Sequence, residues 1–231
     1  MQPWETIDRA RAPDGTEFLL ERRGQEWVVR AGGRMLMSSR AHGSEEALAA
    51  LALNKLEGPR TVLIGGLGLG YTLRAVLERT PADARVIVAE LVPELVAWNK
   101  GPVAHLAGRP LEDPRVRLQI GDVAARIAEA TKAFDAVLLD TDNGPSPLVT
   151  PTNDRLYGDA GVRACRDALK PGGVLAVWSA GPSQRYLERM KRAGLVAEEH
   201  TVHARGVASG VRHAILVGVK PAARRATKRP R

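Results

Sequence analysis

Four short segments of the sequence place glycines or carboxylic acids directly after apolar runs. A glycine loop, IGGLGLG, occupies residues 64–70, and acids follow three later runs at Glu90, at Asp122, and at Asp140 with Asp142. Glycines allow a backbone to approach a ligand closely, and carboxylates accept hydrogen bonds from hydroxyl and amino groups. The pattern predicts one crevice of adenosine size, with the glycine loop on one side and the acids around it.

The glycine loop contains Gly65, Gly66, Gly68 and Gly70 and precedes a predicted helix. Free N–H groups at the start of a helix favour a carboxylate or a phosphate. A dinucleotide fingerprint requires another glycine three residues after its second, and Tyr71 holds that position here. The looser G-x-G-x-G spacing is typical of methyltransferases, and a purely structural tight turn is the alternative.

Glu90 and Asp122 end two predicted strands, and we expect them to hold a nucleoside. Glu90 can accept hydrogen bonds from both ribose hydroxyls, and Asp122 can accept one from the adenine amino group. An ordinary exposed acid is the alternative for Glu90, and an N-cap of the following helix is the alternative for Asp122. We also assign Leu91 and Val123 to the cofactor site.

Asp140 follows the apolar run AVLL. Burial of a carboxylate is unfavourable unless it has a partner, so a functional role is expected for an acid at this position. We predict that Asp140 and Asp142 are catalytic, because two acids at this point can hold an amine and accept its proton. Asp142 and Asn143 have an alternative role as turn residues before Gly144. The predicted substrate site consists of Asp140, Asp142, Asn143 and Tyr157.

Predicted strands and helices alternate over the segment that carries these residues. The strands are TVLIGG, RVIVAE, RVRLQIGD, FDAVLLD and VLAVWSA, and two further strands, LVAEEHTVHA and RHAILVGV, close the segment without an intervening helix. Repeated β-α units form an open, mostly parallel sheet with helices on both faces. We predict a doubly wound, seven-stranded α/β fold of the Rossmann-like class I methyltransferase type, with S-adenosylmethionine as cofactor.

Three domains or segments are expected along the chain. Residues 1–43 form a small N-terminal β appendage with strands at 16–22, 25–30 and 34–37, separated by glycines. Residues 44–219 form the S-adenosylmethionine-binding domain, with a lead-in helix capped by Ser44 and a later helix from about Asp154 to Leu169. Residues 220–231 form a disordered basic tail.

The net charge of +8 is concentrated in that tail, so it does not describe the fold. Six of the eight charges come from the tail, which contains no acid. We expect the tail to be inert or to tether an anionic partner weakly, and we expect no nucleic-acid partner. The basic residues of the tail are Lys220, Arg224, Arg225, Lys228, Arg229 and Arg231.

Metal and membrane functions are not expected. Cys165 is the only cysteine, which excludes a thiolate zinc site, and His200 and His203 fall on opposite faces of a predicted strand. The sequence has no run of 18 apolar residues and starts with a polar segment, so we expect a cytoplasmic protein.

The segment from Gly65 to Gly173 resembles the spermidine synthase family of aminopropyltransferases. The matching pieces are the IGGLGLG loop, the acid of VAE, the GD pair, FDAVLLD with its following GP, and ALKPGG. The resemblance implies a class I sheet behind a small β domain. It also implies that Glu90 and Asp122 hold the nucleoside and that Asp140 accepts a proton from the attacking amine.

The sequence departs from that family mainly where the polyamine would bind. Gly68 stands where the family has an acid that contacts the aminopropyl chain, and Val162 replaces a tyrosine. The family's YHE stretch is present only as SEEALAA, and its D-x-x-D-P loop is shortened, which leaves the match of Asp142 uncertain.

We therefore expect an S-adenosylmethionine-dependent methyltransferase of the spermidine-synthase-like group, acting on a small-molecule acceptor such as an amine. One alternative is an aminopropyltransferase that uses decarboxylated S-adenosylmethionine and a polyamine. Another is a non-catalytic nucleoside-binding or dimerisation protein. The identity of the acceptor, the role of the tail and the oligomeric state are left open, including a homodimer.

Overall fold

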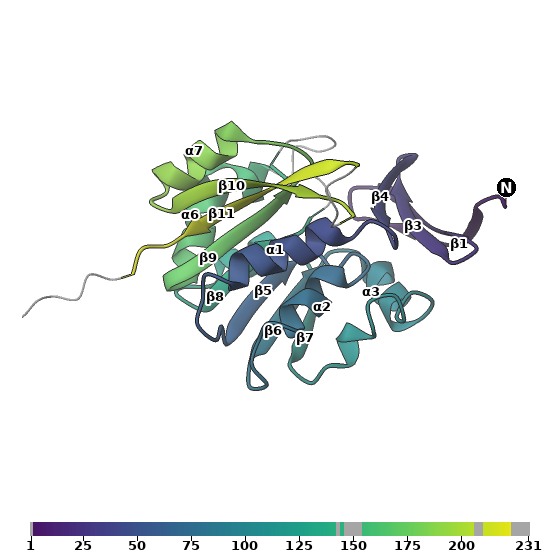
Figure 1. The fold of residues 1–231 in the computed structure, drawn as a ribbon, viewed down its shortest axis with the longest axis horizontal. Coiled ribbons are helices and arrows are strands. Elements are labelled where there is room, and N and C mark those ends of the chain that lie inside the picture. The colour runs from purple at the N-terminus through teal and green to yellow at the C-terminus, as the bar shows by residue number, and fades with distance from the viewer. Residues whose placement is uncertain (1, 142–143, 146–153, 206–209, 223–231) are drawn as a thin grey trace, which may run out of the picture.

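The computed structural model describes residues 2–141, 144–145, 154–205 and 210–222. The predicted seven-stranded α/β sheet is confirmed, with strand order β10-β11-β9-β8-β5-β6-β7. Five strands run parallel, and the last two complete the sheet as an antiparallel hairpin beside β9 (Figure 1). The strands are β5 (Thr61–Gly65), β6 (Arg85–Glu90), β7 (Val116–Ile120), β8 (Phe134–Leu139), β9 (Leu169–Ser179), β10 (Val196–His203) and β11 (Arg212–Val219).

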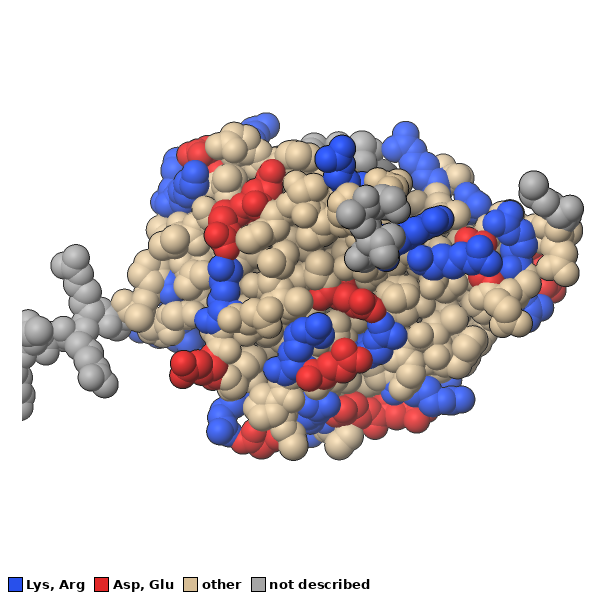
Figure 2. All heavy atoms as spheres, in the orientation of Figure 1, with Lys and Arg blue, Asp and Glu red and all other residues tan. Residues whose placement is uncertain are grey.

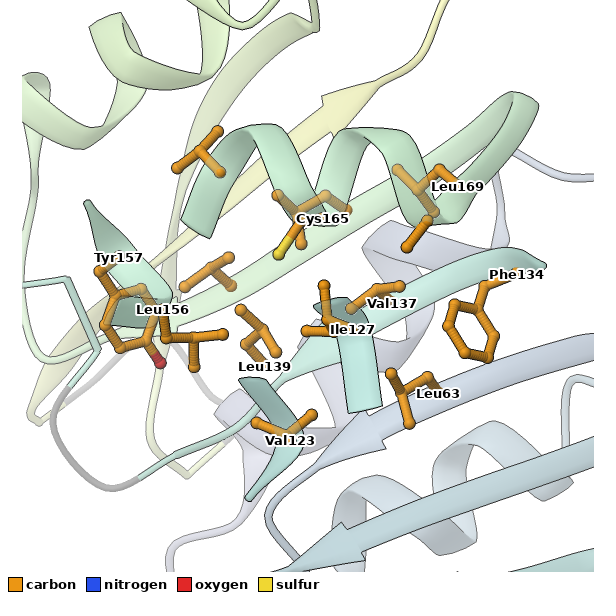
Figure 3. Packing of buried hydrophobic residues seen from close by; sticks show 14 of the residues in the cluster. Leu63, Val123, Ile127, Phe134, Val137, Leu139, Leu156, Tyr157, Cys165 and Leu169 are labelled. Carbon is orange, nitrogen blue, oxygen red and sulfur yellow. The ribbon is translucent and has the colours of Figure 1, made fainter. Parts of the chain in front are cut away.

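Helices cover both faces of this sheet because each face is apolar. On one face, α1 and α2 pack against the sheet through buried Leu48, Leu73 and Val76. On the other, α4, α6 and α7 enclose a cluster that includes Ile127 and Cys165 (Figure 3). The helices are α1 (Gly43–Leu53), α2 (Tyr71–Leu77), α3 (Pro93–Lys100), α4 (Val123–Ala128), α5 (Asp154–Tyr157), α6 (Asp159–Ala168) and α7 (Gln184–Arg192), with a 3-10 turn at Pro110–Glu112.

The N-terminal residues form a four-stranded antiparallel sheet in the order β1-β2-β3-β4, one strand more than predicted. The missed strand, β1, is almost entirely exposed and its sequence ETIDRAR lacks an apolar face, so the sequence gives no burial signal for it. The strands are β1 (Glu5–Arg11), β2 (Glu17–Arg23), β3 (Glu26–Ala31) and β4 (Arg34–Ser38).

This small sheet is packed firmly against the large domain. Phe18, Leu20 and Trp27 share one buried cluster with Leu95 and Trp98 of α3. The indole Nε1 of Trp98 also donates a 2.7 Å hydrogen bond to Asp8 on β1. The term appendage therefore understates the contact, because burial of these large side chains stabilises the arrangement of the two sheets.

Two helix predictions are corrected by the structure. The helix expected from about Asp154 to Leu169 is divided at Gly158, whose backbone is extended, and Leu169 already belongs to β9. The lead-in helix begins at Gly43, so Ser44 lies in the first turn and is not its cap. Its hydroxyl instead donates to the carboxylate of Glu45.

The start of the basic tail also differs from the prediction. Lys220 is buried, and its Nζ donates to the carbonyl oxygens of Arg166 at 2.8 Å and Leu169 at 2.6 Å. Burial lowers the pKa of this amine. Lys220 therefore links the last turn of α6 to the start of β9 through these two hydrogen bonds. Residues 223–231 lie outside the described part of the chain.

Charges over the described surface are mixed. Figure 2 shows Lys and Arg side chains interspersed with Asp and Glu on the face in view. Several of these residues are paired, for example Arg30 with Glu21 and Arg115 with Asp113. Among the described helices, none is both long and apolar enough to cross a membrane.

Candidate active site

A cavity of about 1180 Å³ opens at the carboxyl ends of the parallel strands. Its lining includes residues at the ends of β5, β6 and β8 and residues of the N-terminal sheet. In an open α/β sheet this edge is where ligands bind. The cavity is lined there by Gly66, Glu90, Asp122 and Asp140, and Met37 of β4 also lines it, next to Gly68.

The four glycines of the loop have different tasks. Gly66 and Gly68 line the cavity, both with positive φ. A Cβ on Gly66 would lie 2.3 Å from the carbonyl oxygen of Asp140, so only glycine lets the loop cross β8 this closely. Gly65 packs under Val123, and Gly70 begins α2 in the left-handed conformation; neither lines the cavity.

Glu90 is 5% exposed and holds the backbone of two loops. Its carboxylate accepts hydrogen bonds from the N–H groups of Leu67 and Val92, both at 2.8 Å. Burial raises the pKa of Glu90, and these backbone hydrogen bonds oppose the shift. Each carboxylate oxygen can accept a second hydrogen bond, so Glu90 can also face a hydroxyl-bearing ligand.

Asp122 is the N-cap of α4 and accepts a 2.8 Å hydrogen bond from the N–H of Ala124. The capping role considered from the sequence is therefore present, and Asp122 also lines the cavity. Leu91 and Val123, which follow the two acids, line the cavity as well. Leu91 is 48% exposed, a large apolar surface that a bound ligand would cover.

Asp140 follows β8 and faces the same cavity beside the glycine loop. Thr72 of α2 donates a hydrogen bond to its Oδ2, and burial raises the pKa of Asp140 to about 6. A carboxyl with this pKa is ionised at neutral pH and is close to the range that suits a proton acceptor.

Glu45 is a second carboxyl of the cavity, and sequence reasoning missed it as a functional residue. The structure turns Glu45 of α1 into the cavity, where burial and the charge of Asp140 raise its pKa to about 7. Glu45 reaches the cavity only because α1 packs on one face of the large sheet. No local sequence pattern signals that its first turn meets the cavity.

Of the remaining predicted substrate residues, only Tyr157 lies in the described part of the chain, and it does not line the cavity. Asp142 and Asn143 lie outside the described residues. Tyr157 is 2% exposed and lies beside Leu156 in the buried cluster (Figure 3). Its hydroxyl contacts Thr141, and its ring packs edge-on against Tyr186. It is a core residue, and its neighbour Leu156 lines the cavity instead.

Two aromatic rings extend the wall of the cavity beyond Asp140. Trp178 lines the cavity next to His213, with 4.8 Å between ring centroids. In the described part of the chain, no group of three metal-ligating side chains is found. The described site is therefore one of carboxyls, glycines and apolar or aromatic walls.

Comparison with known proteins agrees with this architecture. Residues 41–191 match the family model described as Spermine/spermidine synthase domain. A polyamine aminopropyltransferase of Nitrosomonas europaea is 35% identical over 127 residues, which cover 55% of this chain and 37% of that protein. Putrescine N-methyltransferase 4 of Nicotiana tabacum is 33% identical over 131 residues, covering 56% of this chain and 32% of that one. The chain thus spans less than half the length of these relatives.

The fold is shared with a solved structure of spermidine synthase from Thermotoga maritima. The TM-score is 0.76 at 19% identity, and the match covers 94% of this chain and 74% of that structure. The two proteins therefore share a fold over nearly the whole of this chain.

The comparisons correct the expectation of a methyltransferase. The family model is named for spermine and spermidine synthesis, and three relatives at 30–35% identity are named polyamine aminopropyltransferase. The expectation depended on Gly68, which removes an acid from the loop. At Gly68 a side chain would meet Met37, because a Cβ there would lie 3.4 Å from its Sδ. The cavity nevertheless contains a carboxyl in addition to Asp140, which Glu45 of α1 supplies. Loss of the loop acid therefore did not mean loss of negative charge.

Proposed function

The chain belongs to the spermine/spermidine synthase domain family, and from this premise we propose that it is an aminopropyltransferase. The proposed donor is decarboxylated S-adenosylmethionine, and the proposed acceptor is a small amine of the polyamine class. The observation that carries the proposal is the cavity itself, which is lined by Glu90 and Asp122 after two neighbouring strands and by the carboxyls of Glu45 and Asp140.

The donor's nucleoside is proposed to bind at the ends of β5, β6 and β7. Glu90 would accept from the ribose hydroxyls while its other lone pairs hold the loops. Asp122 would accept from the adenine amino group, and Gly66 and Gly68 give the donor close access to the backbone. Leu91 and Val123 would cover the faces of the base.

Transfer is proposed to take place at Asp140. An amine must lose a proton before its lone pair can attack carbon, and a carboxylate with a pKa of about 6 can accept that proton at neutral pH. The sulfonium is already a good leaving group, so the remaining task is to align the amine with the carbon next to sulfur. The glycine loop next to Asp140 supports this alignment.

The amine class of the acceptor has its own support. The relatives named above are called polyamine aminopropyltransferase and putrescine N-methyltransferase, and both names specify an amine. The carboxyls of Asp140 and Glu45 are suited to a cation, and the rings of Trp178 and His213 offer a surface for its carbon chain. Ammonium groups and alkyl chains together describe a polyamine.

The test is product formation from a matched pair of donors. The purified protein is incubated with putrescine and either decarboxylated or intact S-adenosylmethionine, and products are identified by mass spectrometry. We expect addition of an aminopropyl group from the decarboxylated donor. Methylated putrescine from the intact donor, without aminopropyl transfer, would overturn the proposal. Donor binding without any product would leave a nucleoside-binding protein, the non-catalytic alternative.

A further inference from the structure

Glu45 and Asp140 reach the cavity from elements far apart in sequence. Glu45 lies in the first turn of α1, and Asp140 follows β8. A neighbouring hydroxyl orients each carboxyl: Ser44 donates to Glu45 at 2.6 Å, and Thr72 donates to Asp140. Both side chains line the same cavity, so a ligand there meets two carboxyls at once.

The described residues supply no cation to this pair. No Lys, Arg or His side chain in the described ranges forms an ion pair with Glu45 or Asp140, whereas the adjacent Glu46 is paired with Arg74 and His42. Two neighbouring acids of one helix therefore differ sharply. Glu46 is neutralised by the protein, and Glu45 faces the cavity without a counter-charge from the described residues.

The raised pKa values of Glu45 and Asp140 suit the binding of a cationic ligand near neutral pH. Burial and the neighbouring carboxylate raise the pKa of Glu45 to about 7, and burial raises that of Asp140 to about 6. Above pH 7 both are ionised, and a cation between them relieves the repulsion of like charges and the cost of burying them.

We propose that Glu45 is a substrate-binding residue that, together with Asp140, holds the ammonium group of the acceptor amine at the point of transfer. The inference rests on the proposed function and adds to it a residue from outside the strand ends. It assigns Glu45 to the acceptor and leaves the nucleoside end of the donor to Glu90 and Asp122.

The reaction then balances around these two carboxyls. The bound ammonium gives one proton to Asp140 and becomes a neutral amine. Its lone pair forms a bond to the aminopropyl carbon, and the electrons of the broken carbon–sulfur bond remain on sulfur, which becomes a neutral thioether. The new secondary ammonium again carries a positive charge. Glu45 keeps its negative charge throughout, so it holds the nitrogen before and after transfer.

The experiment measures putrescine binding by calorimetry with wild type, Glu45→Gln and the matched control Glu46→Gln. Loss of a hydrogen bond to a charged group predicts an increase in the putrescine Kd of about 10- to 100-fold for Glu45→Gln. Glu46→Gln should stay within about threefold, because Glu46 does not line the cavity. Glu45→Asp retains the charge and should recover part of the affinity, which a merely misfolded variant would not show.

The pH dependence gives a second readout. In wild type, affinity for putrescine should fall as pH decreases from about 7 to below 6, because protonation removes the charges of the two carboxyls, whose pKa values are raised. In Glu45→Gln the fall should be shallower and should lie at lower pH, because Asp140 no longer has a charged carboxylate beside it. Glu46→Gln should retain the wild-type profile. The other titratable or charged groups near Glu45 are Glu46 on the same helix, Tyr71 and Arg74 on α2, and His42 before α1.

The outcomes separate this inference from the proposed function. Unchanged putrescine affinity in Glu45→Gln, or a rise in the Michaelis constant for the donor alone, would overturn the role of Glu45 even if wild type transfers aminopropyl groups. Putrescine binding that requires Glu45, without any transfer by wild type, would support the inference and refute the proposed reaction. If wild type binds no putrescine, both are refuted.

Discussion

The two ends of the cavity use carboxyl groups in opposite ways. At the proposed nucleoside end, Glu90 and Asp122 accept hydrogen bonds from backbone N–H groups, so they shape the loops that surround them. At the proposed transfer end, Asp140 and Glu45 are oriented by the hydroxyls of side chains. Burial raises the pKa at all three of Glu90, Asp140 and Glu45, but only at Glu90 do the N–H groups of two loops oppose the shift. The first pair therefore holds the loops in place, and in the second pair Asp140 is the proposed proton acceptor.

Donor binding and proton transfer are thus assigned to different carboxyls of the cavity. A carboxylate held by backbone N–H groups is favoured in its charged form and keeps a fixed position. A carboxyl that is buried beside another acid changes its charge near neutral pH, which suits proton transfer and costs stability. Substitutions at the two ends should therefore have different signatures.

The largest effect is expected for Asp140→Asn at the transfer end. This change keeps the shape and removes the proton acceptor, so the transfer rate should fall by roughly 10²–10⁴ while donor affinity stays close to wild type. Single-turnover rates and donor calorimetry measure the two quantities. Asp135→Asn, at the other end of β8, is the control; its carboxylate holds Thr61 N–H at 2.8 Å, so stability should fall and turnover should not. A fully active Asp140→Asn would remove the chemical role of this carboxylate.

The next largest effect is expected for Glu90→Gln at the nucleoside end. The amide has one acceptor oxygen where the carboxylate has two, so a ribose contact and a loop contact compete for it. Donor affinity should fall about 10- to 100-fold, in keeping with charge-assisted hydrogen bonds. The rate from saturating donor should change much less. Equal donor affinity in wild type and variant would remove Glu90 from the donor site.

The sequence alone predicts the nucleoside end better than the transfer end. Glu90, Asp122 and the glycine loop are set by local order along the chain, because each follows a strand of one parallel sheet. Glu45 belongs to a helix that precedes the sheet, and only tertiary packing brings it to Asp140. A sequence pattern of period 3.6 reports which helix face is apolar and not which cavity its first turn meets.

The same reasoning explains the errors elsewhere in the fold. The strand β1 was missed because its sequence, ETIDRAR, is mostly exposed and lacks the apolar face on which the prediction depends. Lys220 was assigned to a solvated tail because its neighbours in sequence are basic, yet its amine is held by two carbonyl groups at the end of the sheet. Both features are determined by partners distant in sequence.

A smaller effect concerns stability and pH at the transfer end. The folded-state pKa of Glu45, about 7, lies above its ordinary value of 4.5, so the folded protein binds this proton more tightly than the unfolded chain does. Stability from this group is therefore present at low pH and lost as pH rises from about 4.5 to about 7. Glu45→Gln should increase the free energy of unfolding at pH 8 by about 1–3 kcal/mol and should not change it at pH 4. Urea titrations at both pH values test this, and equal stability at pH 8 would contradict the raised pKa.

The smallest effect is expected at Asp122, where the cap and the proposed ligand contact can be separated. Asparagine is as good an N-cap as aspartate, so Asp122→Asn should keep stability within a few tenths of a kcal/mol, whereas Asp122→Ala should lose about 1 kcal/mol. The cap is a contact to the N–H of Ala124, which both carboxylate and amide oxygens can accept. Donor affinity should fall in both variants if Asp122 accepts from the adenine amino group, because the charge is lost in each. Thermal unfolding and donor calorimetry on the pair decide between the roles: a loss of stability in alanine alone, with full donor affinity in both, would leave Asp122 as a cap only.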